Sequence, residues 1–137
     1  MNPFRVTIRT PDEEILDLTQ VRSLTVSTDK GPMIIMSHHA SMTAVTAGSP
    51  LLIVTDRLEE RYMLRRGVVS VNNRRNHVTV LAIACEKLSS MNKQRVSDYL
   101  KSIKDMLKKG SLSPRQRQYL RQEELAMDEQ LKILTRN

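Results

Sequence analysis

Apolar and polar residues alternate with a period of two in the first part of the chain, as is typical of half-buried β-strands. In Phe4–Arg9 the apolar residues Phe4, Val6 and Ile8 alternate with polar ones. Similar runs, separated by turn-forming residues, cover residues 14–18, 21–27, 33–36, 51–55, 60–64, 68–71 and 77–82. Many short strands with frequent turns, and no helical segments between them, predict a β-sandwich or barrel rather than a parallel sheet.

The period changes to a helical one near residue 87. Apolar residues then recur at helical offsets, namely Val96, Tyr99, Leu100, Ile103, Met106 and Leu107. We expect Ser89 or Ser90 to cap this helix and Gly110 to end it in a left-handed conformation. The sequence Ser113-Pro114-Arg115-Gln116 is typical of a capping box, and predicts a second helix from Pro114 to about Thr135.

The two helices are expected to form an antiparallel hairpin, because only a few residues join them. Arg115, Arg117 and Arg121 lie near the positive end of the second helix dipole, where each would cost about 0.3–1 kcal/mol. The hairpin is therefore expected to depend on docking. The predicted organisation is a β-sandwich over residues 1–86, followed by a two-helix hairpin over residues 87–137.

The net charge of +7 is concentrated in the predicted hairpin. Residues 1–86 carry 10 Lys and Arg against 9 Asp and Glu, whereas residues 87–137 carry 12 against 6. Such a basic tail is typical of proteins with acidic partners, although it is equally typical of a solvated helix face. Aromatic residues make up only 3% of the chain, which disfavours a stacking platform for nucleic acid bases.

The residues that could carry chemistry do not form a recognisable active site. His38 and His39 are adjacent, His77 is isolated, and the single Cys85 follows a small apolar run typical of packing. A zinc site needs three or four such ligands gathered by the fold. The four glycines are dispersed, so the sequence contains no phosphate-binding glycine-rich loop. We therefore expect no enzyme activity, no metal and no cofactor.

No run approaches the ~18 consecutive apolar residues of a membrane span, and the first residues lack the apolar stretch of a signal peptide. We expect the protein to act on the side of the membrane where it is synthesised.

Residues 31–42, with the sequence GPMIIMSHHASM, resemble a signature of the epsilon subunit of bacterial ATP synthase. Gly31, Ile35, His39 and Ala40 match it, whereas two glycines and two prolines that are usual in the family are absent. Three further stretches are similar to the family in order and spacing, namely residues 4–12, 62–71 and 77–86. In the second of these, Arg66 replaces the first of two usual glycines. With the two-helix tail, the resemblance covers nearly the whole chain.

The resemblance implies a non-catalytic rotor subunit of an F-type ATP synthase. It would bind the gamma subunit and the c-ring, coupling ion translocation to ATP synthesis. The implied contacts with the ring come from the segment that carries Gly31, Ile35, Ser37, His38, His39 and Ala40. The subunit would be peripheral to the membrane, on the cytoplasmic face of the cell inner membrane or the stromal side of a thylakoid.

The resemblance also gives the hairpin a regulatory role. It implies that the hairpin can extend toward an acidic segment of the catalytic beta subunit and inhibit ATP hydrolysis. From their charge, we expect Arg115, Arg117 and Arg121 to act together on that segment. The family's ATP-binding motif aligns with Met91–Val96, where Arg95 is kept and Asn92 replaces an aspartate. Loss of this carboxylate acceptor predicts weak or absent ATP binding. The same segment is also compatible with an ordinary first turn of a helix.

Two other functions remain open from the residues alone. One is a small nucleic-acid-binding protein that uses the basic hairpin on phosphates. The other is a metal-dependent enzyme that uses His38, His39 and His77.

Overall fold

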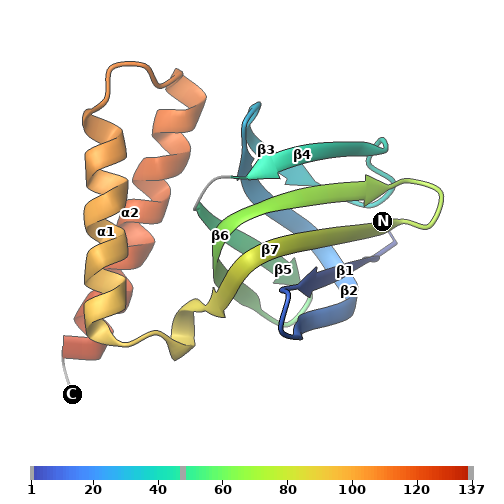
Figure 1. The fold of residues 1–137 in the computed structure, drawn as a ribbon, viewed down its shortest axis with the longest axis horizontal. Coiled ribbons are helices and arrows are strands. Elements are labelled where there is room, and N and C mark those ends of the chain that lie inside the picture. The colour runs from blue at the N-terminus through green and yellow to red at the C-terminus, as the bar shows by residue number, and fades with distance from the viewer. Residues whose placement is uncertain (1, 47–48, 136–137) are drawn as a thin grey trace. The chain divides into compact units, whose positions relative to one another are not determined.

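The computed structural model describes residues 2–46 and 49–135. The chain divides into two compact units between Lys87 and Leu88, one residue from the expected boundary, and each unit is described by itself. Within the described residues the first unit contains seven strands, shown in Figure 1: β1 (Phe4–Arg9), β2 (Glu14–Thr28), β3 (Gly31–Ile35), β4 (Met42–Thr46), β5 (Ser49–Thr55), β6 (Glu59–Asn72) and β7 (His77–Lys87).

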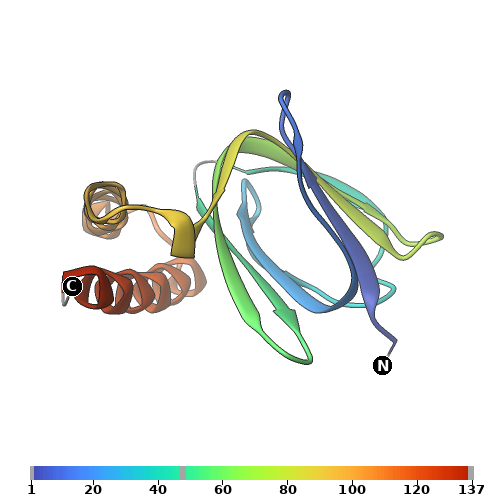
Figure 2. The same ribbon diagram turned by 90° about the horizontal axis from the view of Figure 1, so that it is seen from below.

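The strands form a sheet that curls back on itself. Its order is β1-β7-β6-β5-β2-β3, with β4 paired to β6, and β1 also pairs with β2. The β1–β7 pair is parallel, whereas the other pairs are antiparallel. In Figure 2 the strands curve around a common centre. The β-sandwich-like sheet followed by two helices confirms the predicted fold class.

The centre of the first unit is filled by the inward-facing residues of the alternating strands. Its fully buried side chains include Val6, Ile8, Val21, Leu24, Val26, Ile35, Leu51, Ile53, Val69 and Val80. Burial of such side chains from several strands is what stabilises an antiparallel sheet of this kind.

Two pairs of predicted strands are each one long strand in the structure. Strand β2 continues through Thr19 and Gln20, because Val21 pairs with both Phe4 on β1 and Thr55 on β5. Strand β6 likewise continues through Gly67. Because of their length, each of the two strands pairs with three others: β2 with β1, β3 and β5, and β6 with β4, β5 and β7.

Strand β4 lies in a stretch for which the sequence pattern predicts no strand. Its inward-facing residues are Ala44 and Thr46, which are buried at 3% and 0% exposure. Because both are small, the stretch lacks the large apolar residues that mark the other strands. Its pairing with β6 holds it in the sheet.

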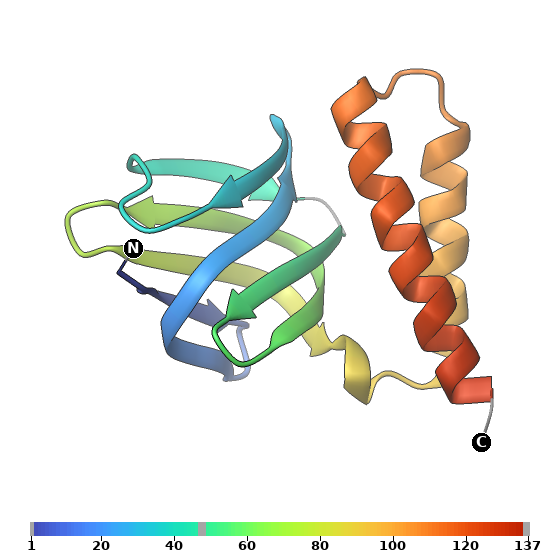
Figure 3. The same ribbon diagram turned by 180° about the vertical axis from the view of Figure 1, so that it is seen from behind.

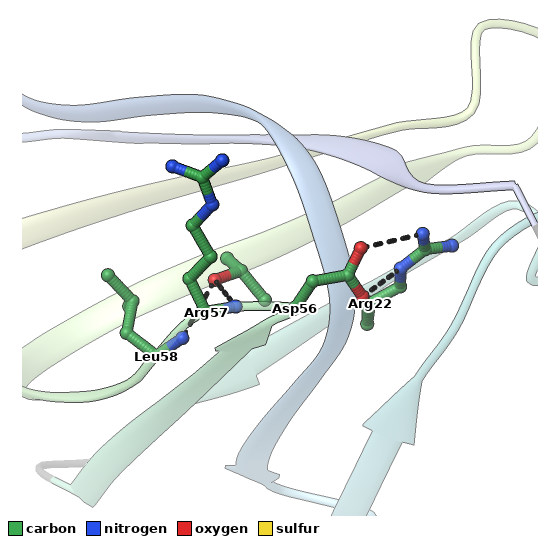
Figure 4. Close-up of polar contacts among 5 residues, drawn as sticks. Arg22, Asp56, Arg57 and Leu58 are labelled. Carbon is green, nitrogen blue, oxygen red and sulfur yellow. Dashed lines mark hydrogen bonds and ion pairs between the residues drawn. The ribbon is translucent and has the colours of Figure 1, made fainter.

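The turn between β5 and β6 is held by side-chain hydrogen bonds (Figure 4). The hydroxyl of Thr55 accepts from the backbone N–H groups of Arg57 (3.3 Å) and Leu58 (3.2 Å). Asp56 accepts two hydrogen bonds from the Arg22 guanidinium, at 2.8 and 2.9 Å. The turn is therefore tied to β2, although an exposed pair of this kind contributes little stability.

The second unit is a pair of antiparallel helices joined by a short loop, as Figure 3 shows. A 3₁₀ turn (η1, Leu88–Ser90) precedes α1 (Lys93–Lys108), and α2 (Pro114–Thr135) follows. No helix of the described ranges 2–46 and 49–135 has both the length and the apolar character needed to cross a membrane.

The ends of α1 differ from the prediction. The N-cap is Asn92 rather than Ser89 or Ser90, and its side chain accepts a hydrogen bond from the Arg95 N–H at 2.9 Å. At the other end, Lys109 leaves the helix in an extended conformation. The prediction that Gly110 ends the helix in a left-handed conformation is therefore wrong, because Lys109 already ends the helix in an extended conformation.

The start of α2 confirms the predicted capping box. The backbone N–H of Ser113 donates to the Gln116 side chain at 3.0 Å, and the backbone N–H of Gln116 donates to the Ser113 hydroxyl at 3.2 Å. Pro114 is the first helical residue, where its missing N–H is not needed. Local chemistry alone sets this boundary.

Candidate interaction sites

The segment predicted to face the ring does not form one loop. Gly31 and Ile35 belong to β3, and the Ile35 side chain is 0% exposed in the core. Gly31 is also buried, with φ at 105°, a conformation that glycine adopts readily. These two residues are buried within β3, where they position the segment that follows. The loop proper is 36–41.

Asparagine side chains fix this loop to the turn between β6 and β7. Asn73 Nδ2 donates to the carbonyl oxygens of His38 (2.7 Å) and His39 (3.1 Å). Asn76 Oδ1 accepts from the His38 N–H at 2.7 Å, and Asn76 Nδ2 donates to Ser37 Oγ at 3.0 Å. His38 has a positive φ of 61°, which these bonds hold in place. The neighbouring turn thus orders the loop, together with the loop's own hydrogen bond from the His39 N–H to the Met36 carbonyl at 3.2 Å.

Sequence reasoning missed Asn73 and Asn76 as site residues. The Asn72-Asn73 pair indicates a turn, but no sequence signal shows that these amides reach a loop more than 30 residues away.

The joined loop and turn form a polar, basic end of the sheet. His38 and Ala40 are exposed on the loop, whereas Ser37 and His39 are half-buried. Arg74 and Arg75 are exposed on the adjoining turn. The exposed polar and cationic groups of this end are suited to polar or acidic partner loops.

The three histidines are not gathered into a metal site. His39 Nδ1 is hydrogen-bonded to the Ala40 carbonyl at 2.9 Å, and His77 Nε2 to the Thr7 hydroxyl at 2.8 Å. Among the described residues, no three His, Cys, Asp or Glu side chains are placed to hold a metal ion.

His77 is the first residue of β7, and its side chain is partly buried near the charged groups of Arg5, Asp17 and Arg75. Burial lowers its pKa below the ordinary value of 6.5, and the charges of Arg5 and Arg75 lower it further, while Asp17 opposes them. As pH falls, the unfolded chain therefore takes up the proton first, and the free energy of unfolding decreases below about pH 6.5.

We expect His77→Gln, which keeps a polar partner for Thr7, to remove part of this loss of stability. Urea unfolding of both chains between pH 8 and pH 5 measures it. His38 and His39 remain in both chains, so the difference isolates His77. Equal pH dependence in both chains would contradict the assignment.

Cys85 is half-buried against the core. Burial raises the pKa of its thiol to about 12, with a smaller contribution from Glu86. A thiol with this pKa is protonated at neutral pH and is a poor nucleophile. The interpretation of Cys85 as a packing residue agrees with this environment.

The three arginines of α2 have different surroundings. Arg117 donates from Nη1 to the Leu107 carbonyl at 2.9 Å and from Nη2 to the Lys109 carbonyl at 3.3 Å. It therefore caps the C-terminal end of α1, where a cation is favourable. Arg115 and Arg121 are exposed. The prediction that all three arginines are unfavourably placed at the positive end of the α2 dipole is therefore wrong for Arg117, because its guanidinium lies at the negative end of α1.

The ATP-motif remnant coincides with the start of α1. Met91 is buried at 7% exposure. The oxygen of the Asn92 side chain serves as the N-cap acceptor for Arg95. The ordinary-helix interpretation of this segment thus has a physical basis.

These observations describe a small β-sandwich protein with a helical hairpin and a polar loop end suited to docking. A family model described as "ATP synthase, Delta/Epsilon chain, beta-sandwich domain" matches residues 3–88. The chain belongs to this family. No curated protein matches the chain.

Two solved structures have a similar fold. One is from the Euglena gracilis mitochondrial ATP synthase (OSCP/F1/c-ring), with 18% identity, a TM-score of 0.66, and coverage of 94% of this chain and 82% of that one. The other is from the Tetrahymena thermophila mitochondrial ATP synthase (central stalk/c-ring), with 16% identity, a TM-score of 0.56, and coverage of 98% and 99%. The nucleic-acid-binding alternative is not supported by these findings.

Proposed function

We propose that this protein is the epsilon-type subunit of the central stalk of an F-type ATP synthase. The match of the family model over residues 3–88 carries the proposal. The similar chains come from an F1/c-ring complex and from a central stalk/c-ring complex. In this role the protein binds the gamma subunit and the c-ring, and has no catalytic site of its own. It lies at the membrane face that carries the catalytic head.

The basic end of the sheet is the proposed contact with the ring. Loop 36–41 offers exposed His38, and the adjoining turn offers Arg74 and Arg75. The asparagine bonds hold these groups together before any partner binds, which reduces the entropy that docking would otherwise cost.

The test is assembly with purified stalk components. The full chain should form a stable complex with the gamma subunit and join the ring in its presence. A chain of residues 1–87 should do the same, because the sandwich has its own core. Absence of binding by the full chain would overturn the proposal. Binding by the full chain but not by residues 1–87 would show that the hairpin is required.

The protein is expected to bind ATP weakly or not at all, because the one side-chain oxygen of Asn92 serves as the N-cap, and Asn92 lacks the second carboxylate oxygen that an aspartate would keep available. Calorimetry on the isolated protein at millimolar ATP should show little heat. The Asn92→Asp variant supplies a carboxylate that can still cap the helix, and any gain in its ATP binding would support the motif assignment. Saturable micromolar binding by the wild type would contradict the expectation.

A further inference from the structure

A chain of hydrogen bonds connects His77 to the loop at the basic end of the sheet. His77 directly follows Asn76, the residue that holds this loop. Asn76 Oδ1 accepts from the His38 N–H at 2.7 Å, and Nδ2 donates to Ser37 Oγ at 3.0 Å. The same Nδ2 donates to the Pro3 carbonyl oxygen at 3.3 Å. The loop is thus held by the residue next to an imidazole, a group that titrates close to physiological pH.

The backbone of Asn76 makes this hold sensitive to its neighbours. Its φ is 51°, in the left-handed region, which asparagine can enter but which depends on support from surrounding bonds. Its N–H donates to the Asn73 carbonyl oxygen at 3.1 Å, and its carbonyl oxygen accepts from the Arg5 N–H at 3.1 Å. Because His77 is the next residue, a displacement of His77 changes the direction in which the Asn76 side chain points.

Groups from each element around His77 bear on its charge. Its Nε2 is hydrogen-bonded at 2.8 Å to the hydroxyl of Thr7 on β1, and Thr7 is only 6% exposed. The charged groups that act on the imidazole are Arg5 on β1, Asp17 on β2 and Arg75 in the turn, and its partner on β6 is the uncharged Asn72. Two of these three charges are positive.

The balance of these groups disfavours a positive imidazolium. The two oxygens of Asp17 accept from Arg5 Nε at 2.9 Å and Nη2 at 2.8 Å, so the carboxylate is already shared with a guanidinium. Burial and the two arginines lower the pKa of His77, and the attraction of Asp17 does not offset them. A proton therefore binds more readily after the imidazole has moved out of this position. By linkage, acid favours the state in which it has moved.

We propose that protonation of His77 loosens loop 36–41, so that the basic end of the sheet is ordered at neutral pH and mobile in acid. The imidazole takes up one proton from solvent and moves away from the two guanidinium groups. Asn76 moves with it, and its bonds to the loop break, whereas the bonds from Asn73 remain. This inference rests on the proposed function, to which it adds regulation of the ring contact by pH.

The first measurement uses the full chain alone. NMR follows the exchange with solvent of the His38 N–H, which donates to Asn76. The ratio of its exchange rate in the wild type to that in His77→Gln should rise ~3-fold or more between pH 7.5 and pH 5.5, because only the wild type gains the open state. His38 is present in both chains, so its own titration cancels.

The chain offers matched controls. The Leu58 N–H is likewise held by a side chain in an exposed turn, the Thr55 hydroxyl at 3.2 Å, and its exchange ratio should stay constant with pH. His39→Gln removes a half-buried histidine of the loop itself and should keep the wild-type pH dependence. Arg75→Gln removes one of the charges that repel the imidazolium, and should reduce the effect of acid.

The second measurement concerns the ring. Binding of the full chain to the gamma subunit and ring is compared at pH 7.5 and pH 5.5 for the wild type and His77→Gln. The loss of affinity on acidification should be ~2- to 3-fold larger for the wild type, because a mobile loop must be ordered again on docking.

The outcomes separate the two proposals. If the exchange ratio of the His38 N–H does not change with pH, or if His39→Gln abolishes the change, the switch at His77 is overturned and the proposed function stands. If the ratio changes but no stalk complex forms at either pH, the proposed function is overturned and the switch within the chain stands. If the complex forms and its affinity has the same pH dependence in both chains, regulation of the ring contact is overturned.

Discussion

Replacing Gly67 with alanine should destabilise the sandwich by about 1–3 kcal/mol, the range seen when a well-packed region is overfilled. A Cβ at this position would lie 2.5 Å from the Leu81 carbonyl oxygen and 3.2 Å from the Ala82 Cα. Both are backbone atoms of β7, and Gly67 pairs directly with Ala82 in the ladder. No rotation of a side chain can relieve the contact, so β6 and β7 must separate locally.

The chain offers a matched control in Gly110. A Cβ built there meets no atom within 4 Å. Gly110→Ala should therefore change the free energy of unfolding by less than about 0.5 kcal/mol, as is usual for surface substitutions. Urea unfolding of the full chain measures both variants. Equal stability of Gly67→Ala and the wild type would show that the strands are less closely held than the structure indicates.

Gly67 also shows why part of the fold was predictable and part was not. Alternation of apolar residues identified most strands, because burial on one face dictates that pattern. A glycine in the middle of a strand has two readings from sequence, a turn or a close approach of two backbones. Only the pairing with β7 decides between them. Strand β4 escaped detection for a related reason, since Ala44 and Thr46 fill little space.

The helix boundaries show the same division between local and distant causes. The capping box at Ser113 involves residues within one turn, and it was predicted correctly. The end of α1 depends on Arg117, whose guanidinium reaches back across the loop to carbonyl oxygens 8 and 10 residues earlier. A local pattern of residues does not contain that contact.

The candidate site was predicted as a segment but not as a surface. The family resemblance indicates residues 31–42, yet residues 31–35 form strand β3 and Ile35 belongs to the core. The exposed loop 36–41 is ordered by the side-chain amides of Asn73 and Asn76, which lie in the turn between β6 and β7. The pairing of β4 and β7 with β6 depends on the strand register, which the sequence alone does not specify.

The hairpin is expected to restrain ATP hydrolysis in the assembled enzyme through its positive charge, a role that the family resemblance implies. Deletion of residues 88–137 should raise hydrolysis the most. Replacing Arg115 and Arg121 together with alanine should raise it partway, because both are exposed and available to an acidic partner. Exposed ion pairs contribute up to about 1 kcal/mol each. Two of them can therefore shift the population of an extended hairpin by roughly tenfold or more.

Arg117 must be tested separately, because its guanidinium caps α1. Arg117→Ala should lower the thermal stability of the hairpin, whereas Arg115→Ala with Arg121→Ala should not. Arg117→Lys keeps the charge but loses the planar contact with two carbonyl groups. If charge is the cause of inhibition, Arg117→Lys should inhibit more than Arg117→Ala at equal stability.

The control for net charge is the pair Lys101→Ala and Lys104→Ala, which removes the same charge from exposed positions on α1. If inhibition depends on where the charge lies, this pair should leave hydrolysis near the wild-type rate. Salt should weaken the inhibition by the wild type and have less effect on the Arg115 and Arg121 double variant. An electrostatic role for the hairpin is excluded if the deletion and the double variant both hydrolyse ATP at the wild-type rate across the salt series. A specific acidic contact at Arg115 and Arg121 is excluded if the lysine pair has the same effect as the arginine pair, because the inhibition would then follow total charge.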